Sequence, residues 1–261
     1  MSISMKRWYV LVAAVGVAAL ILMTGYQVQR TRDQYPVYKG RELFGDTYPF
    51  TFVFFGDCRP TDGSQHPEVF ITMLGQINEL DPLFVVGGGD FVFEGTPHDF
   101  EAFLETVSVL KPPLLYVCGN HDDSPYYSQH LGDRVYAITY RNALFVILDN
   151  SRKVLNESQL EFLENQLKRG VEHTFVFMHV PPLDPQGTYC MIHPEEFLEI
   201  VQKYHVDYVF CSHIHHLYEE DINGTTLIVS GGAGSSLTRQ GFHHYIVVRV
   251  GDEVTYEVIP L

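Results

Sequence analysis

The stretch TFVFFGDCRP (51–60) places an unbroken apolar run directly before a glycine, an aspartate and, two residues later, an arginine. A short apolar run of this kind is typical of a strand that is covered on both faces of its sheet. Asp57 then lies where the strand ends, which is a suitable position for a metal ligand. Arg59 is the anomaly, because it is a cation where a second ligand is expected.

Four later segments repeat this arrangement of an apolar run followed by polar residues. The polar residues are Asp90 after LFVVGGG (83–89), Asn120, His121 and Asp122 after LLYVCG (114–119), His179 after FVFM (175–178), and His213 and His215 after YVFCS (208–212). Ligands in α/β sheets collect at the carboxyl ends of strands. Carboxylate and amide oxygens mixed with imidazoles suit Mn²⁺, Fe or Zn²⁺, and they differ from a pure Ca²⁺ set or a structural zinc set.

The segments between these runs predict helices. Residues 68–80 and 156–169 carry apolar side chains at helical spacing, and residues 96–99 (TPHD) are typical of a capped helix start. Two apolar runs around Arg141–Asn142 predict a hairpin, and three runs from Thr226 onward predict antiparallel strands. Mixed strands with helices between them indicate an α/β fold of two packed sheets between helical layers.

The ordered motifs resemble those of the calcineurin-like metallophosphoesterase family. The family's GDxH, GD, GNH[DE], H and GHxH are represented here by GDCR, GGD, GNHD, HVPP and SHIH, over about residues 50–247. The resemblance implies a four-layer αββα sandwich of two mixed sheets flanked by helices. It also implies a hydrolase that cleaves a phosphate mono- or diester with a metal-activated hydroxide as nucleophile.

The resemblance further implies which residues hold two divalent ions, with Mn, Fe or Zn expected. The implied ligands are Asp57, Asp90 and His215 for the first ion, and Asp90 as a bridge with Asn120, His179 and His213 for the second. His121 would stand over the substrate without binding metal, as a proton donor to the leaving oxygen or as a stabilising cation. Asp122 or Asp123 would orient the His121 imidazole.

Arg59 departs from the family pattern, because a guanidinium has no lone pair to give a metal. Three readings follow. Water or another side chain, such as His66, fills the vacant ligand position of a weaker first site. Alternatively, Arg59 grips a phosphate oxygen with its forked donors. In the third reading Arg59 replaces the charge of the first ion, and only one ion is tightly bound.

The functional alternative is a metal- or substrate-binding protein whose catalysis faded when Arg59 replaced a ligand. Retention of His121 favours the enzyme, because a binding protein needs no proton donor. Within enzymes, a pyrophosphatase acting on a lipid-linked or nucleotide substrate is a further alternative. The net charge of −15, from 17 Lys and Arg against 32 Asp and Glu, argues against a nucleic-acid partner.

The N-terminus predicts a membrane partner. Lys6 and Arg7 precede 19 uncharged residues, 8–26, which are long enough to approach the thickness of a bilayer core. We predict an uncleaved anchor over residues 1–26, with a cleaved signal peptide as the alternative, a linker over 27–48 and the catalytic domain over 49–261. The export-like start favours a domain on the extracytoplasmic side of the membrane.

Four cysteines, at positions 58, 118, 190 and 211, leave two disulfides possible in an oxidising compartment. Cys58, Cys118 and Cys211 each adjoin a strand end beside a candidate motif. A small buried apolar side chain suits such a position, so we predict free thiols.

Overall fold

The strands form two mixed sheets in the computed structural model, which describes residues 35–62, 65–239 and 241–261. In the seven-stranded sheet the order is β1 (Val37–Lys39), β5 (Tyr136–Tyr140), β6 (Ala143–Ile147), β7 (His173–Phe177), β8 (Tyr208–Cys211), β10 (Thr225–Ser230) and β9 (Leu217–Ile222). In the five-stranded sheet the order is β12 (Val254–Pro260), β11 (His244–Val250), β2 (Phe50–Phe55), β3 (Phe84–Gly87) and β4 (Leu114–Tyr116). The apolar run that opens the sequence pattern is therefore the central strand of its sheet.

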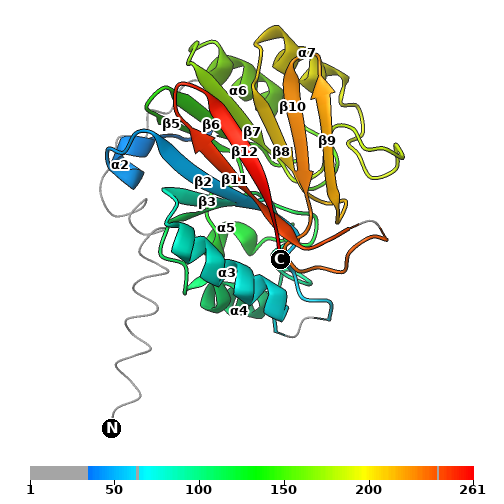
Figure 1. Ribbon diagram of the computed structural model, residues 1–261. Coiled ribbons are helices and arrows are strands. Elements are labelled where there is room, and N and C mark those ends of the chain that lie inside the picture. Colours follow the sequence, from blue (N-terminus) through cyan, green and yellow to red (C-terminus); the bar gives the residue numbers. More distant parts are fainter. Residues whose placement is uncertain (1–34, 63–64, 240) are drawn as a thin grey trace.

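Two pairs of helices cover the outer faces of the sheets (Figure 1). Helices α3 (Glu68–Leu80) and α4 (Pro97–Val107) pack on the five-stranded sheet, and α6 (Glu157–Leu167) and α7 (Glu195–Lys203) pack on the seven-stranded sheet. The shorter helices are α2 (Gly40–Phe44) and α5 (Tyr127–His130). The order of layers is helices, sheet, sheet, helices, which agrees with the predicted two mixed sheets flanked by helices.

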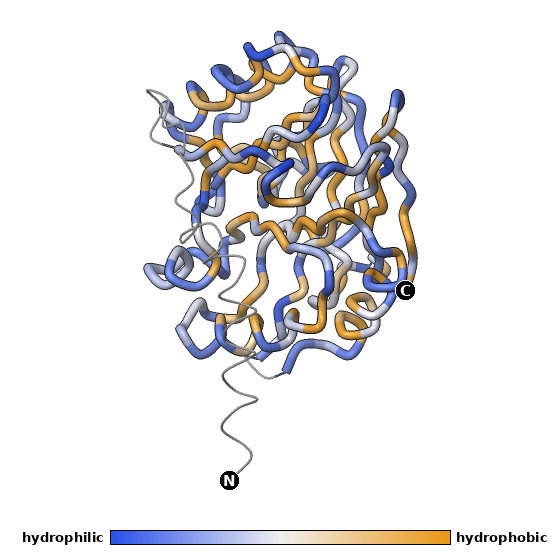
Figure 2. Tube along the Cα trace, turned by 90° about the vertical axis from the view of Figure 1, so that its left-hand side faces the viewer, coloured by the Kyte–Doolittle hydropathy of each residue, from blue (hydrophilic) through white to orange (hydrophobic). Residues whose placement is uncertain are grey.

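The space between the two sheets is filled largely by aromatic side chains. Phe52 is fully buried there. Its ring centroid lies 5.3 to 6.0 Å from those of five others, Phe84, Phe145, Phe175, Phe177 and Phe210. Figure 2 shows the apolar strands running through the interior and the hydrophilic segments concentrated outside. This seam holds the two sheets, and therefore their strand ends, in a fixed relation.

Local sequence signals set the element boundaries as predicted. Helix α4 begins with a capping box, in which the Thr96 hydroxyl accepts from the Asp99 amide and the Asp99 carboxylate accepts from the Thr96 amide. Pro97 occupies the first turn, where its missing N–H costs nothing. The predicted hairpin is confirmed, because β5 and β6 pair antiparallel as far as Tyr140 opposite Ala143.

The domain begins earlier than the sequence pattern predicts. Strand β1 and helix α2 lie inside the predicted linker (27–48), and β1 pairs in parallel with β5. The ring of Phe44 stacks on Phe84 at 4.7 Å, so this segment is packed on the inter-sheet core. A three-residue strand is too short to show a period, which is why the sequence did not reveal it.

The C-terminal strands differ from the prediction in one pairing. Strand β10 pairs in parallel with β8, and its antiparallel partner is β9, a strand that the sequence pattern did not predict. Strand β11 is antiparallel to both β2 and β12. The parallel pairing of β8 with β10 places the segment after Ser230 close to the histidines that follow β8.

The predicted membrane segment (1–26) and the first part of the predicted linker (27–34) lie outside the described residues. Within the described ranges, no helix combines the length and the apolar character needed to cross a bilayer. The predicted free thiols are found, since Cys58, Cys118 and Cys211 are buried and unpaired and Cys190 is partly buried and unpaired.

Candidate metal centre

The ends of β2, β3, β7 and β8 meet at one edge of the two sheets. Asp57 follows β2 and Asp90 follows the parallel neighbour β3, and their loops are joined by a backbone hydrogen bond from the Arg59 amide to the Asp90 carbonyl (3.0 Å). Oδ2 of Asp57 accepts from the His213 amide (2.8 Å), so one ligand candidate ties the two sheets together. The predicted convergence of these residues is therefore present in the structure.

Four of the candidate ligands have left-handed backbone conformations. Asp57, Asp90, His213 and His215 have φ values of 59°, 56°, 73° and 52°. Such conformations are uncommon for residues with a side chain, and each costs on the order of 1–3 kcal/mol. The cluster of unfavourable conformations at the strand ends is a functional signal, because nothing in sheet geometry requires it.

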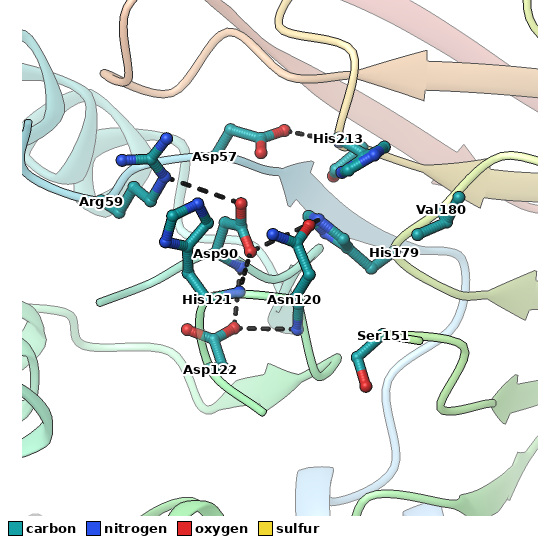
Figure 3. A network of polar contacts seen from close by, with 12 residues as sticks. Asp57, Arg59, Asp90, Asn120, His121, Asp122, Ser151, His179, Val180 and His213 are labelled. Atoms are coloured by element: carbon teal, nitrogen blue, oxygen red, sulfur yellow. Dashed lines mark hydrogen bonds and ion pairs between the residues drawn. The ribbon is translucent and has the colours of Figure 1, made fainter. Parts of the chain in front are cut away.

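Asp90 stands at the centre of the cluster and is almost fully buried (Figure 3). Its Oδ1 accepts from the His121 amide at 2.9 Å and lies 3.4 Å from Nε2 of His179. Its Oδ2 faces the other way, 3.7 Å from Nε of Arg59. The two oxygens of one carboxylate thus face two different sets of residues.

Two candidate ligand histidines are held in the same orientation. His179 donates from Nδ1 to the Gly88 carbonyl (2.8 Å), and its Nε2 lies 3.2 Å from Oδ1 of Asn120. His215 donates from Nδ1 to the Ser236 carbonyl (2.6 Å), and its Nε2 lies 3.4 Å from Oδ1 of Asp57. Fixing Nδ1 on a backbone carbonyl presents Nε2 to the site, which is the usual arrangement of metal-binding histidines.

The donor set fits divalent cations. Oδ1 of Asp57 and Nε2 of His213 are buried without a hydrogen-bond partner, which is costly unless a ligand uses their lone pairs. Burial and the positive charge of His179 lower the pKa of His213 to about 3, so its imidazole stays neutral. Oxygen or nitrogen atoms of Asp57, Asp90 and His179 lie within 4.8 Å of one another.

Glycines keep the centre open. A Cβ on Gly119 would lie 2.3 Å from Oδ1 of Asp90, and a Cβ on Gly231 would lie 2.7 Å from Oδ2 of Asp57. Any side chain at these positions would displace a candidate ligand. The glycine that precedes Asn120 is therefore required by space, as is the first glycine after β10.

The charges of the centre are strongly interdependent. Burial raises the pKa of Asp57, but the close polar contact with His215 and the positive charges of His179 and His215 outweigh it, so the net pKa is lowered. Burial lowers the pKa of His215, but Asp57 and the Ser236 carbonyl raise it to about 9. A buried carboxylate is here stabilised by surrounding cations, and a metal ion would replace that function.

His121 is oriented differently from the prediction. Its Nδ1 lies 2.8 Å from the carbonyl of Phe93, so a backbone group holds the half-buried imidazole, and neither Asp122 nor Asp123 does. With Nδ1 donating to that carbonyl, Nε2 is the nitrogen left for a substrate. His121 lines the same cavity as Asp90.

Asp122 has a structural position rather than the predicted catalytic one. It is fully buried. Its two oxygens accept from four backbone amides, those of Asp90 (2.7 Å), Gly119 (2.9 Å), Phe91 (2.8 Å) and Val92 (3.2 Å). Burial and the charge of Asp90 raise the pKa of Asp122 to about 7, although these hydrogen bonds oppose the shift. Asp122 thus joins the loop after β3 to the loop after β4.

His66 does not fill the position left by Arg59. Its Nε2 lies 2.9 Å from the Phe91 carbonyl and its Nδ1 lies 3.3 Å from the Thr106 hydroxyl. Its ring packs between those of Phe70 and Phe103. The suggestion that His66 completes the first metal site is therefore wrong, because both of its nitrogens are already engaged.

A cleft of about 530 Å³ opens above the centre. Its outer wall contains residues that the sequence did not single out, namely Gln186, Tyr189, Thr238 and Arg239. The Asp184 carboxylate shapes one side of this wall by accepting from the amides of Gln186 and Tyr189, both at 2.7 Å. The signal available in the sequence was the Pro- and Gly-containing segment directly after His179.

Comparison with known proteins gives concordant results. A family model described as calcineurin-like phosphoesterase matches residues 50–217. The chain is 28% identical over 165 residues to the 3′,5′-cyclic adenosine monophosphate phosphodiesterase CpdA of Escherichia coli K12, covering 56% of this chain and 59% of that protein. It is 29% identical over 175 residues to the glycerophosphodiester phosphodiesterase GpdQ of Enterobacter lignolyticus, covering 56% and 61%.

Among solved structures, the purple acid phosphatase PPD1 from yellow lupin (Lupinus luteus) seeds has a TM-score of 0.68 with 18% identity. The superposition covers 83% of this chain and 53% of the lupin chain. At this identity the likeness is one of fold. The chain spans about three fifths of the length of the curated relatives that it matches.

Proposed function

This chain belongs to the calcineurin-like phosphoesterase family, and from that premise we propose that it is a metal-dependent phosphodiesterase. The observation that carries the proposal is the cluster of Asp57, Asp90 and His179, whose potential ligand atoms lie within 4.8 Å of one another beside an open cleft. Two buried polar atoms of the centre, Asp57 Oδ1 and His213 Nε2, have no hydrogen-bond partner. A purely structural cluster would be expected to satisfy its buried donors internally. The phosphodiesterase names of the curated relatives favour a diester over a monoester.

We propose that two divalent ions bind at the cluster. Asp57, Asp90 and His215 would hold one, and Asp90, Asn120, His179 and His213 the other. Bound divalent ions would supply the positive charge that activates a water nucleophile and neutralises the phosphoryl oxygens. The protein contributes fixed ligand orientation, because backbone carbonyls anchor His179 and His215 through Nδ1.

His121 is the proposed proton donor of this chain. The Phe93 carbonyl fixes its Nδ1, so its Nε2 is the nitrogen from which a proton would pass to the leaving alkoxide. The His121 amide also donates to Oδ1 of Asp90, so backbone and imidazole are positioned together. His121→Asn would remove the transferable proton and leave every proposed ligand in place. We expect turnover to fall about 10²–10⁴-fold with metal content unchanged.

The direct test is hydrolysis of bis(p-nitrophenyl) phosphate and p-nitrophenyl phosphate by the purified full chain. The protein is first stripped with a chelator, and Mn²⁺, Fe²⁺, Zn²⁺ or Mg²⁺ is then added back. We expect metal-dependent turnover with the diester cleaved faster than the monoester. Metal binding without hydrolysis of either ester would instead favour the binding-protein alternative.

We also propose that the chain is anchored in a membrane by its N-terminal segment, with the catalytic domain on the extracytoplasmic side. The support is the uncharged stretch 8–26, flanked by Lys6 and Arg7. Extraction of membranes at alkaline pH tests the anchor, since an embedded segment resists extraction. Protease protection in intact cells tests the side on which the domain lies.

A further inference from the structure

The position of Arg59 points to a division of labour inside the centre. Resting on the proposed function, we infer that Arg59 makes the two metal positions unequal, and that its guanidinium binds a phosphoryl oxygen of the substrate beside the weaker position. The inference concerns the residue by which this chain departs from the family motif. It selects between the three readings that the sequence left open.

The two oxygens of the Asp90 carboxylate face different residues. Oδ1 faces Nε2 of His179 at 3.4 Å, on the side that also holds Asn120. Oδ2 faces Nε of Arg59 at 3.7 Å. A cation at the first position would share Oδ2 with a fixed guanidinium, and like charges at such separations repel appreciably even at an effective dielectric constant of about 20. The second position meets no such competitor among the described residues.

The two proposed metal positions differ in their number of candidate ligand residues. The second position has four candidate ligand residues, which are Asp90, Asn120, His179 and His213. The first position has Asp57, Asp90 and His215, because Arg59 offers no lone pair and His66 is engaged elsewhere. Loss of a supporting residue alone weakens metal sites roughly 10–100-fold, and a missing direct ligand is expected to cost at least as much.

The N–H donors of the Arg59 guanidinium have few hydrogen-bond acceptors within the described residues. Nε is buried without a hydrogen-bond partner, and among the described residues the guanidinium makes one long hydrogen bond, from Nη1 to the Pro60 carbonyl (3.5 Å). The side chain is 18% exposed and lines the cleft with His121. The backbone of Arg59 is nevertheless fixed, because its amide donates to Asp90 and its carbonyl accepts from the Ser235 hydroxyl.

A positioned guanidinium with donors to spare is suited to an anion. Its forked N–H groups match the geometry of phosphoryl oxygens, and such charge-assisted hydrogen bonds are the strong ones in proteins. Figure 3 shows the guanidinium of Arg59 and the imidazole of His121 flanking the same side of Asp90. A phosphoryl group between the proposed ions and His121 would therefore lie within the space that Arg59 borders.

Metal titration of the full chain tests the inequality without any hydrolysable substrate. Mn²⁺ binding is followed by calorimetry in the wild type, Arg59→His, Arg59→Gln and Arg239→Gln. We expect two wild-type dissociation constants that differ by about tenfold or more. Arg59→His, which adds a ligand and removes the cation, tightens the weaker site about tenfold or more and leaves the tighter one nearly unchanged.

Arg239→Gln is the matched control, because Arg239 lines the same cleft from an exposed position. It removes the same charge, and solvent screening leaves both metal affinities at their wild-type values. Two equally tight Mn²⁺ sites that are unchanged in Arg59→His would overturn the inference. Equal tightening of Mn²⁺ binding in Arg59→Gln and Arg239→Gln would do so too, since it would indicate a general charge effect.

Inorganic phosphate is the probe for the second half of the inference. We expect Arg59→Gln to weaken phosphate binding to the Mn²⁺-loaded protein about tenfold or more, and Arg59→Lys, which keeps the charge but loses the fork, to weaken it less. Phosphate affinity equal to the wild type in Arg59→Gln would overturn this half. Absence of hydrolysis by the wild type would contradict the proposed function and leave the inference about Arg59 intact, because neither binding measurement requires turnover.

Discussion

The aromatic seam between the sheets and the polar edge at the strand ends are built from the same strands, yet they obey opposite rules. Phe52 in the seam is fully buried and packs against other aromatic rings from within a regular strand. Asp57, which begins the polar edge two residues after β2 ends, is equally buried but charged and left-handed. Packing in the seam stabilises the fold, and part of that stability offsets the unfavourable backbone conformations of the candidate ligands at the edge.

The largest expected effect belongs to the polar edge. Asp90→Asn removes the charge shared by both proposed ions, so we expect hydrolysis to fall on the order of 10⁴-fold, roughly 5 kcal/mol of transition-state stabilisation. The metal-free variant should unfold at a lower urea concentration than the wild type, because Arg59 and His179 lose their carboxylate partner. Urea unfolding in a chelator and diester hydrolysis measure the two effects. A variant that keeps wild-type hydrolysis would contradict the proposed role of Asp90.

The next effect belongs to the seam. Phe52→Ala leaves a cavity among five rings and is expected to reduce the free energy of unfolding by about 3–5 kcal/mol. Turnover per folded molecule should change little at low temperature, because Phe52 lies among the rings of the seam, three residues before the end of β2. Urea unfolding monitored by fluorescence gives the first quantity, and active-site titration with Mn²⁺ gives the second. Phe52→Leu, which keeps most of the volume, should retain most of the lost stability.

Asp122 tests whether the two regions are separable at all. It belongs to the GNHD motif of the edge, yet its carboxylate acts as a buried link between two loops. Asp122→Ala leaves backbone amides without an acceptor, so we expect a loss of about 2–3 kcal/mol in stability together with weaker Mn²⁺ binding. Calorimetry and urea unfolding measure both in the same preparation. Loss of activity at full stability would return Asp122 to the catalytic role that the motif suggested.

The fold was readable from the sequence because five strands, β2, β3, β4, β7 and β8, are apolar runs that end in a polar motif. The order of these motifs identified Asp57, Asp90 and His213 as neighbours, since carboxyl ends of strands share an edge. Strand β1 escaped prediction, because three residues carry no periodicity and its partner β5 is distant in sequence. The membrane segment lies outside the described residues, so it stays a prediction.

The direction of side chains was what the sequence could not supply. Adjacency in GNHD suggested that Asp122 orients His121, but successive residues in a turn point apart, and a backbone carbonyl of Phe93 takes that role. Carbonyl groups have no signature in sequence. His66 was a candidate for the vacant ligand position, but its two ring nitrogens contact the Phe91 carbonyl and the Thr106 hydroxyl. The convergence of the candidate ligands was thus predictable, and the contacts that orient their neighbours were not.

The smallest expected effect lies on the surface, away from both regions, and it serves as the reference for changes in stability and activity. Glu164 on α6 contacts Lys203 and Tyr204 at the end of α7, and these hydrogen bonds, with that of Lys168, lower the pKa of Glu164 from 4.5 to about 2. A lowered folded-state pKa stabilises the protein above pH 4.5, and the contribution is lost as the pH falls toward 2.

Glu164→Gln should therefore lower the urea midpoint slightly at pH 6, and the difference should shrink below pH 4.5. It should leave diester hydrolysis unchanged, because Glu164 lies on α6, away from the candidate metal centre. A pH-independent loss would mean that Glu164 acts through packing, because only the ionised carboxylate makes the contribution that disappears in acid.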